Sequence, residues 1–252
     1  MRLVPVNLPF RLRLFVSALL LGLSGCFVSC ATTKIHYVDE GAASQLKGPR
    51  NVAIGGVLGT GSAEGMHPED RDDIASFLEQ QLKKKRRHLA VSSPMLFESI
   101  VGRPYVRPRS DRTSLSHFLA PSQQEKLRNS RFDYVLFLVL DQQETWCDVE
   151  ESEDTEEEHE YDRHGNIIAC YTTTTYTTSS RAHRKASGDF LLFDARTGKR
   201  VWKASSQNSE CHTRSSCSTI SYPLPPPHPD PPTLADVVQN MSQSMSRKFP
   251  KR

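Results

Sequence analysis

The sequence predicts an α/β fold, a mixed β-sheet flanked by helices in a three-layer sandwich. Three observations support this class. Residues 132–140 (FDYVLFLVL) are almost continuously apolar, which is typical of a strand covered on both faces. Segments with helical spacing lie before and after that run, and a strand-turn-strand pattern follows at residues 190–204. A strand covered on both faces needs a layer on each side of the sheet.

The first half of the domain alternates strands and helices. Residues 51–58 (NVAIGGVL) are expected to form a strand, and residues 89–92 a second, shorter one. Residues 68–87 show helical spacing between them, with acids at the start and the basic cluster 83–87 at the end, where the helix dipole favours each charge. That cluster could instead bind anionic lipid headgroups or peptidoglycan. Residues 115–129 are expected to form a second helix.

The second half contains the clearest hairpin. Residues 171–180 (YTTTTYTTSS) suit a solvated or edge strand, because they combine high β propensity with no large aliphatic side chain. In the hairpin at residues 190–204, Gly198 stands at a left-handed turn position and Trp202 is expected in the core. These strands complete a sheet whose centre is the buried run.

A proline-rich spacer and a final helix follow the hairpin. Residues 222–232 (YPLPPPHPDPP) cannot enter a sheet interior and are expected to run as extended polyproline II. Thr233 is the expected N-cap of a helix over residues 234–248 with a continuous apolar stripe. We therefore expect one domain, residues 51–249, which is long enough to bury a sizeable core.

Residues 1–25 have the features of an export signal. They contain three Arg, no acid and an apolar run far shorter than the ~20 residues that span a bilayer as a helix. The signal ends in Leu-Ser-Gly before Cys26, which resembles the lipobox of bacterial lipoproteins, where the cysteine is acylated. An uncleaved anchor or a buried helix is the alternative. Acyl chains on Cys26 would hold the protein at a membrane. The same resemblance implies the outer membrane, because Phe27 stands where Asp would be expected in a lipoprotein kept at the inner membrane.

Residues 26–50 are rich in small residues and are expected to form a flexible tether. The tether would leave the folded domain facing the periplasm. That compartment permits disulfides, which bears on the remaining cysteines.

Five cysteines remain after Cys26, so at least one thiol is left over, and Cys30 in the tether is the obvious candidate. The other four allow three pairings; they are Cys147, Cys170, Cys211 and Cys217. A Cys147–Cys170 bond would close the base of the segment between them if that segment folds back. A Cys211–Cys217 bond would close a short local loop. A zinc site that includes His212 is the alternative, although no C-x-x-C spacing is present.

Residues 148–166 form an acidic insert. Ten of the fifteen residues 148–162 are Asp or Glu, and their mutual repulsion predicts a disordered loop that ends in a turn at residues 162–166. A docking surface for a basic partner is the functional interpretation, whereas the calcium-loop spacing Asp-x-Asp-x-Asp-Gly is missing. The candidate partner-binding residues are Asp148, Glu150, Glu151, Glu153, Asp154, Glu156, Glu157 and Glu158.

No motif predicts catalysis, a cofactor or a metal. His159 and His164 are five residues apart, whereas the metalloprotease helix requires four. The glycines after the first strand do not match G-x-x-x-x-G-K-[ST], and no G-x-S-x-G is present. Outside residues 1–25 the chain has 29 basic and 29 acidic residues, so it lacks the charge excess typical of nucleic-acid binding. We therefore expect neither an enzyme nor a nucleic-acid partner.

Two segments resemble known envelope lipoproteins: residues 131–136 (RFDYVL) and residues 188–202 (GDFLLFDARTGKRVW). They are similar to a DYvl strand and a later D-x-x-T-G-x-x-v-W hairpin in families related to the curli secretion channel subunit and to the outer-membrane activator of penicillin-binding proteins. The resemblance implies an α/β domain like the N-terminal domain of TolB, and it bears on fold more than on function. The acidic insert and the lack of amphipathic pore hairpins distinguish this chain.

These observations favour a non-enzymatic outer-membrane lipoprotein. Its periplasmic domain would bind another cell-envelope component and support that component's assembly or activity. A self-assembling ring or secretion component, and hence a homo-oligomer, is the alternative. A hydrolase with a scattered active site is the second alternative.

Overall fold

The computed structural model describes residues 31–106 and 111–250. Its sheet has six strands in the order β1-β6-β5-β4-β2-β3. Strand β2 is parallel to β3 and to β4, and the other neighbouring strands are antiparallel. The predicted mixed α/β class is confirmed. The export signal, Cys26 and Cys30 lie outside the described residues.

Most predicted elements of the domain are present. The strands are β1 (Thr32–Val38), β2 (Arg50–Gly59), β3 (Leu89–Ser92), β4 (Tyr134–Tyr161), β5 (Ile167–Asp194) and β6 (Arg200–Ser218). The helices are α2 (Glu40–Gln45), α3 (Pro68–Lys85), α4 (Pro94–Val101), α5 (Pro121–Arg128) and α6 (Leu234–Lys248), with 3-10 turns η1 (Gly61–Ala63) and η2 (Leu115–His117). The expected helix over residues 115–129 is split because Pro121 disfavours helical geometry in the residue before it.

Strand β4 separates two hydrophobic clusters, because alternate side chains of a strand point to opposite faces. Leu136 and Leu138 pack with residues of α3 and α6 in one cluster. Val135 and Phe137 pack with residues of α4, η2 and α5 in the other, where the Phe137 and Phe118 rings stack with centroids 5.0 Å apart. The strand is therefore covered on both faces, as its sequence predicts.

The expected tether over residues 26–50 is wrong for the part that the structure describes. Strand β1 pairs with β6, and Asp39 caps α2 by accepting a hydrogen bond from the Ala42 amide at 2.9 Å. Leu46 is 1% exposed and belongs to the hydrophobic core. The β-branched and aromatic residues of β1 favour an extended strand. The folded domain therefore begins before the predicted boundary at residue 51.

The predicted disorder of residues 148–166 is also wrong. Strand β4 continues through the acids to Tyr161, and β5 pairs with it along its whole length. These acids of β4 lie opposite Thr, Ser, Tyr, Ala and Arg of β5, not opposite other acids, so cross-strand repulsion does not open the hairpin. The predicted turn is present: the Asp162 carboxylate accepts hydrogen bonds from the amides of His164 and Asn166.

The prediction of a solvated or edge strand at residues 171–180 holds for residues 171–175, which pair with β4 alone, but not for residues 176–180, which lie between two strands. They belong to β5, which has β4 on one side and, from Tyr176 onward, β6 on the other. Their high β propensity supplies the ordered strand against which the acidic residues pair.

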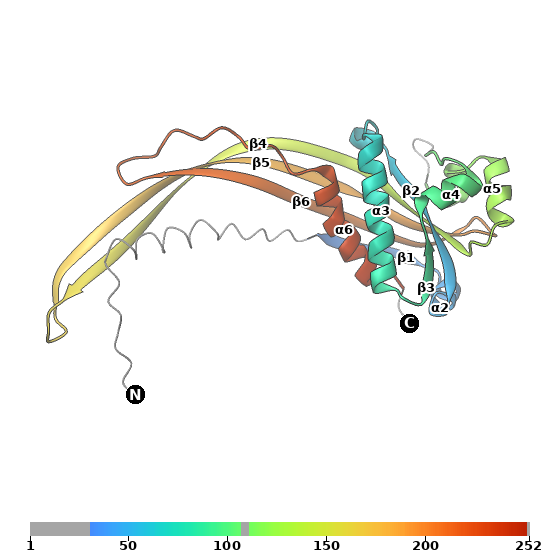
Figure 1. Ribbon diagram of the computed structural model, residues 1–252, viewed down its shortest axis with the longest axis horizontal. Helices are drawn as coiled ribbons and strands as arrows, with labels where there is room; N and C mark the ends of the chain where they lie inside the picture. The colour runs from blue at the N-terminus through green and yellow to red at the C-terminus, as the bar shows by residue number, and fades with distance from the viewer. Residues whose placement is uncertain (1–30, 107–110, 251–252) are drawn as a thin grey trace.

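The three strands β4, β5 and β6 extend well beyond the helices on one side of the molecule (Figure 1). We call this extension the arm and define it as residues 142–187 of β4 and β5 with residues 208–218 of β6. The remaining described residues are the body. After β6 the chain returns alongside the arm to α6 (Figure 1).

Candidate functional site: the projecting arm

An ion network fixes the root of the arm. The Arg112 guanidinium donates to both carboxylate oxygens of Asp141, at 2.6 and 3.1 Å, and to the Thr60 hydroxyl at 3.1 Å. Lys203 pairs with Asp189 at 2.8 Å, and the Ser205 hydroxyl donates to the same carboxylate at 2.5 Å. The network therefore ties both hairpin strands to the body at the point where the arm leaves it.

The network also sets the ionisation of Asp141. Burial acts to raise the pKa of this carboxyl, but hydrogen bonds from Arg112 and Thr60 outweigh burial and hold the pKa below its ordinary value. Asp141 and Asp189 line a polar cavity of about 480 Å³ beside the root. The hydrogen bond from Ser205 to Asp189 makes this serine part of the ion network.

We predict that Arg112→Ala destabilises the chain by about 2 kcal/mol at pH 7, because it removes charged hydrogen bonds at the arm root. A depressed carboxyl pKa stabilises the fold above the ordinary pKa, near 4, and this contribution is lost as the pH falls. The difference between parent and variant should therefore shrink below about pH 4. Urea unfolding at several pH values measures it. Arg103→Ala, at an exposed arginine of the same loop, is the control; equal loss in both variants would contradict the role of Arg112.

The outer edge of the arm is a long acidic strand. Strand β2 pairs with β4 only as far as Leu140, and from Gln142 to Tyr161 the described partner of β4 is β5 alone. Charged side chains on an edge strand oppose uncontrolled strand pairing. A partner of this edge is therefore expected to bind its carboxylates and not to extend its sheet.

One face of the arm is covered by the proline-rich residues 222–232. The Ser180 hydroxyl donates to the Pro226 carbonyl at 2.5 Å, and the Tyr176 and Tyr222 rings lie edge to face with centroids 5.0 Å apart. Thr178 and Ser180 are fully buried there. The segment is thus a spacer, as predicted, but one that packs against the strands.

The opposite, open face carries charges of both signs. Asp148 lies 3.2 Å from the His183 ring nitrogen, and Glu150 forms an ion pair with Arg181. Trp146 stacks on His183, with ring centroids 4.8 Å apart, and remains 41% exposed. Farther out, the β5 residues opposite the acids of β4 are Ser, Thr, Tyr and Ala, so the acids of the outer arm face no basic residue across the strand.

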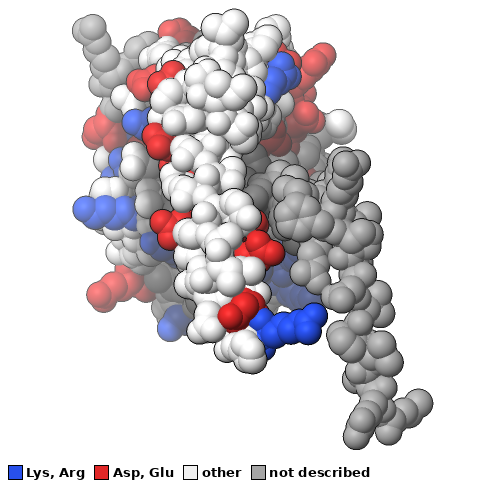
Figure 2. Space-filling view, turned by 90° about the vertical axis from the view of Figure 1, so that its left-hand side faces the viewer, with Lys and Arg blue, Asp and Glu red and all other residues white. Residues whose placement is uncertain are grey.

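Viewed from the arm's end, the molecule shows acidic side chains along the margins of a column of uncharged residues (Figure 2). All eight predicted partner-binding acids lie on β4, and all are exposed.

The body carries exposed positive charge at the end of α3, on Lys84, Lys85 and Arg87. Arg86 is turned inward and donates to the Phe249 carbonyl at 2.7 Å. The basic cluster therefore ends a helix, as predicted.

The structure does not bring the cysteines together. Cys147 lies opposite Ala182 and Cys170 opposite His159, which separates them by twelve residues, or about 40 Å, along the strands. A disulfide requires Cα atoms within about 7 Å. Cys211 and Cys217 are six residues apart on the extended β6 and are also free. The structure therefore shows neither the Cys147–Cys170 nor the Cys211–Cys217 bond, and the register of the hairpin keeps the first pair apart.

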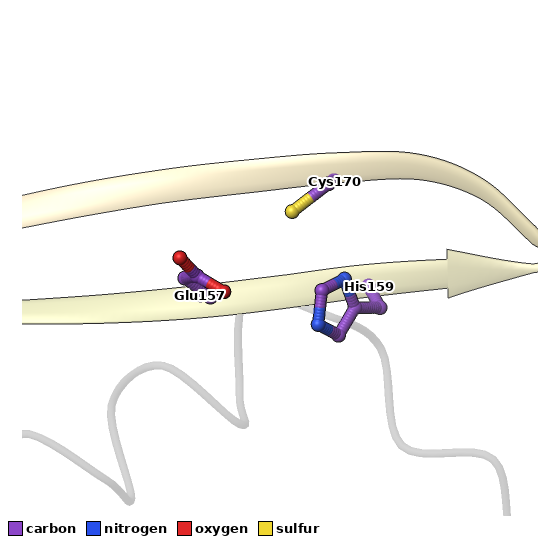
Figure 3. Close-up of side chains that lie close together, drawn as sticks. All are labelled: Glu157, His159 and Cys170. Atoms are coloured by element: carbon purple, nitrogen blue, oxygen red, sulfur yellow. The ribbon is translucent and has the colours of Figure 1, made fainter.

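The tip of the arm holds a group of metal-ligand types that sequence analysis missed. Ligand atoms of Glu157, His159 and Cys170 lie within 4.8 Å of one another, and all three side chains are exposed (Figure 3). Glu157 and His159 share a face of β4, and Cys170 lies directly across from His159 on β5. The available signal was the alternation Glu-x-His, which is meaningful only if the segment is a strand.

A scan of known protein families and a search of curated proteins find no match to the chain. Among solved structures it is similar to a PelC dodecamer from Paraburkholderia phytofirmans, at 12% identity and a TM-score of 0.40, over 88% of this chain and 99% of that chain. A point variant of the same dodecamer in another crystal form gives 13% identity and a TM-score of 0.36, over 89% and 100%. Similarity at this level does not establish a family.

The resemblance to curli secretion and penicillin-binding-protein activator lipoproteins is not supported by a family match. Its two segments are nevertheless structural, since they form the start of β4 and the β5–β6 hairpin. Within the part of the chain that the structure describes, no helix is both long and apolar enough to span a membrane.

Proposed function

We propose that this chain is a non-enzymatic envelope lipoprotein whose copies assemble, with the acidic arm of one copy on the basic body of the next. The charge distribution carries the proposal. The arm has 12 acids and 5 basic residues, so the rest of residues 26–252, which holds 29 of each, has 17 acids against 24 basic residues. The two parts of one chain are therefore complementary in charge, and complementary surfaces favour association.

The shape of the chain supports a contact between copies. The arm projects away from the helices (Figure 1), so its outer half has no body of its own to bind. Arm and body are different surfaces, and a contact between different surfaces is heterologous. Repeated heterologous contacts produce a ring when the rotation closes. The ring-forming alternative is thus better supported than capture of an unrelated partner.

The anchor is part of the proposal. Acylation of Cys26 would hold the copies in one membrane, outer by the absence of Asp at position 27, and would raise their local concentration. We also propose that the helices on the two sheet faces correspond to a three-layer, TolB-like arrangement. The two hydrophobic clusters on opposite faces of β4 support it.

The experiment is a molar-mass measurement on the full-length protein in detergent, by size-exclusion chromatography with light scattering. We expect a multimer at about 0.1 M salt that dissociates at about 1 M, because the Debye length falls from about 10 to about 3 Å. A monomer at low salt would contradict self-assembly. If that monomer instead retains one envelope protein through its arm, the partner-binding alternative replaces the proposal.

A further inference from the structure

We propose that Glu157, His159 and Cys170 form a zinc site that fastens the tip of the arm. The three ligands come from both strands of the β4–β5 hairpin, two from one strand and one from the other (Figure 3). This proposal goes beyond the proposed function and does not depend on self-assembly.

The geometry suits a small ion. Zinc bonds of 2.0–2.3 Å in a tetrahedral site place ligand atoms about 3.3–3.8 Å apart. The three ligand atoms lie within 4.8 Å of one another, and because their side chains are exposed, small rotations bring them to bonding distance. Direct cross-strand pairing of His159 with Cys170 keeps the set on one face of the hairpin. Three protein ligands leave a fourth position for water.

The donor types favour zinc over calcium and magnesium. A thiolate, an imidazole nitrogen and one carboxylate are the ligands that zinc uses, whereas calcium and magnesium require six or more oxygens. On binding, the Cys170 thiol would lose its proton to solvent and the sulfur would bond the metal. The neighbouring acids of β4 add a negative potential that concentrates cations at the tip.

A metal bond between the strands is expected to stabilise the hairpin most at the tip of the arm. Strand β6 ends at Ser218, opposite Tyr176, so the hairpin beyond it has two strands only. A two-stranded hairpin is marginally stable in water. The His159 ring lies edge to face with Tyr161, with centroids 6.3 Å apart, which orients the imidazole on the same strand. A metal bond between β4 and β5 would hold this ribbon together without a disulfide.

The test uses full-length protein in detergent with a phosphine reductant, titrated with Zn²⁺ by calorimetry and with Co²⁺ by absorption spectroscopy. We expect one Zn²⁺ per chain and a thiolate-to-cobalt charge-transfer band. Cys170→Ser and His159→Gln should each weaken zinc binding by more than about tenfold, since loss of a direct ligand exceeds loss of an outer-shell contact. Cys217→Ser removes another exposed arm thiol and should bind like the parent.

Amide hydrogen exchange measures whether bound zinc stabilises the pairing of β4 with β5 at the tip. Zinc should slow amide exchange in residues 154–175 of the parent and of Cys217→Ser, but not of Cys170→Ser. Equal zinc affinity in parent and Cys170→Ser, a cobalt spectrum without the thiolate band, or Cys170 recovered in a disulfide from freshly isolated protein would overturn the site. Because these readouts do not require multimers, failure of the zinc site and failure of self-assembly are distinguishable.

Discussion

A chain in which Asn-Gly replaces residues 154–175 should fold like the parent and remain monomeric. The replaced residues form the two-stranded tip, and none of them belongs to either hydrophobic cluster. Asn-Gly suits the two-residue turn that would join Glu153 to Tyr176, which pair directly across the hairpin. The truncated arm keeps its third strand and its proline-rich cover, so the free energy of unfolding should change by less than about 0.5 kcal/mol.

The truncation removes six of the ten clustered acids and the part of the arm that reaches farthest from the body. Light scattering in detergent at about 0.1 M salt should therefore give a monomer where the parent gives a multimer. Circular dichroism and urea unfolding establish that the body is intact. A truncated chain that still forms the parent's multimer would show that the arm tip is not the contact.

Neutralising acids of the arm should weaken assembly by roughly 30-fold. The variant replaces Glu153, Asp154, Glu156 and Glu158 with their amides and leaves Glu157 in place for the metal. Four exposed ion pairs at about 0.5 kcal/mol each contribute about 2 kcal/mol of association free energy. Sedimentation over a range of protein concentrations measures the change. Residual association should depend less on salt than that of the parent.

The matched control neutralises four acids at the start of α3: Glu69, Asp70, Asp72 and Asp73. It changes net charge by the same amount but on the body, so it should leave assembly unchanged or strengthen it. A small loss of stability is expected because these acids favour the helix dipole. Equal weakening in both variants would mean that net charge matters and that the position of the acids does not.

The elements that the sequence predicts well are those set by local chemistry. Gly198 adopts φ +71° in the predicted hairpin turn, and Thr233 caps α6 by accepting a hydrogen bond from the Asp236 amide at 3.1 Å. The buried run at residues 132–140 lies inside the sheet. Helix α4 is not among the predicted elements, although Ser93 is a typical N-cap and Pro94 a typical first helical residue.

The arm was missed because its order depends on pairing between distant residues. Repulsion within residues 148–162 alone predicts an open loop, whereas their strand neighbours in β5 are uncharged or basic and allow pairing. The separation of Cys147 from Cys170 has the same origin, since the pairing places them twelve residues apart along the two strands. Register also places Cys170 beside Glu157 and His159, which the Glu-x-His spacing alone does not show.

The most direct test of assembly is carbodiimide cross-linking of a mixture of ¹⁵N-labelled and unlabelled full-length protein in detergent. This reagent joins carboxylates to lysines in contact without adding a spacer. Only a link between copies can join a labelled to an unlabelled peptide, so mass spectrometry identifies such links by their mixed isotope pattern. We predict links between copies that join the acids of residues 148–160 to lysines of the body, foremost Lys84 and Lys85. Links confined to single chains, together with a monomeric mass, would contradict assembly through the arm.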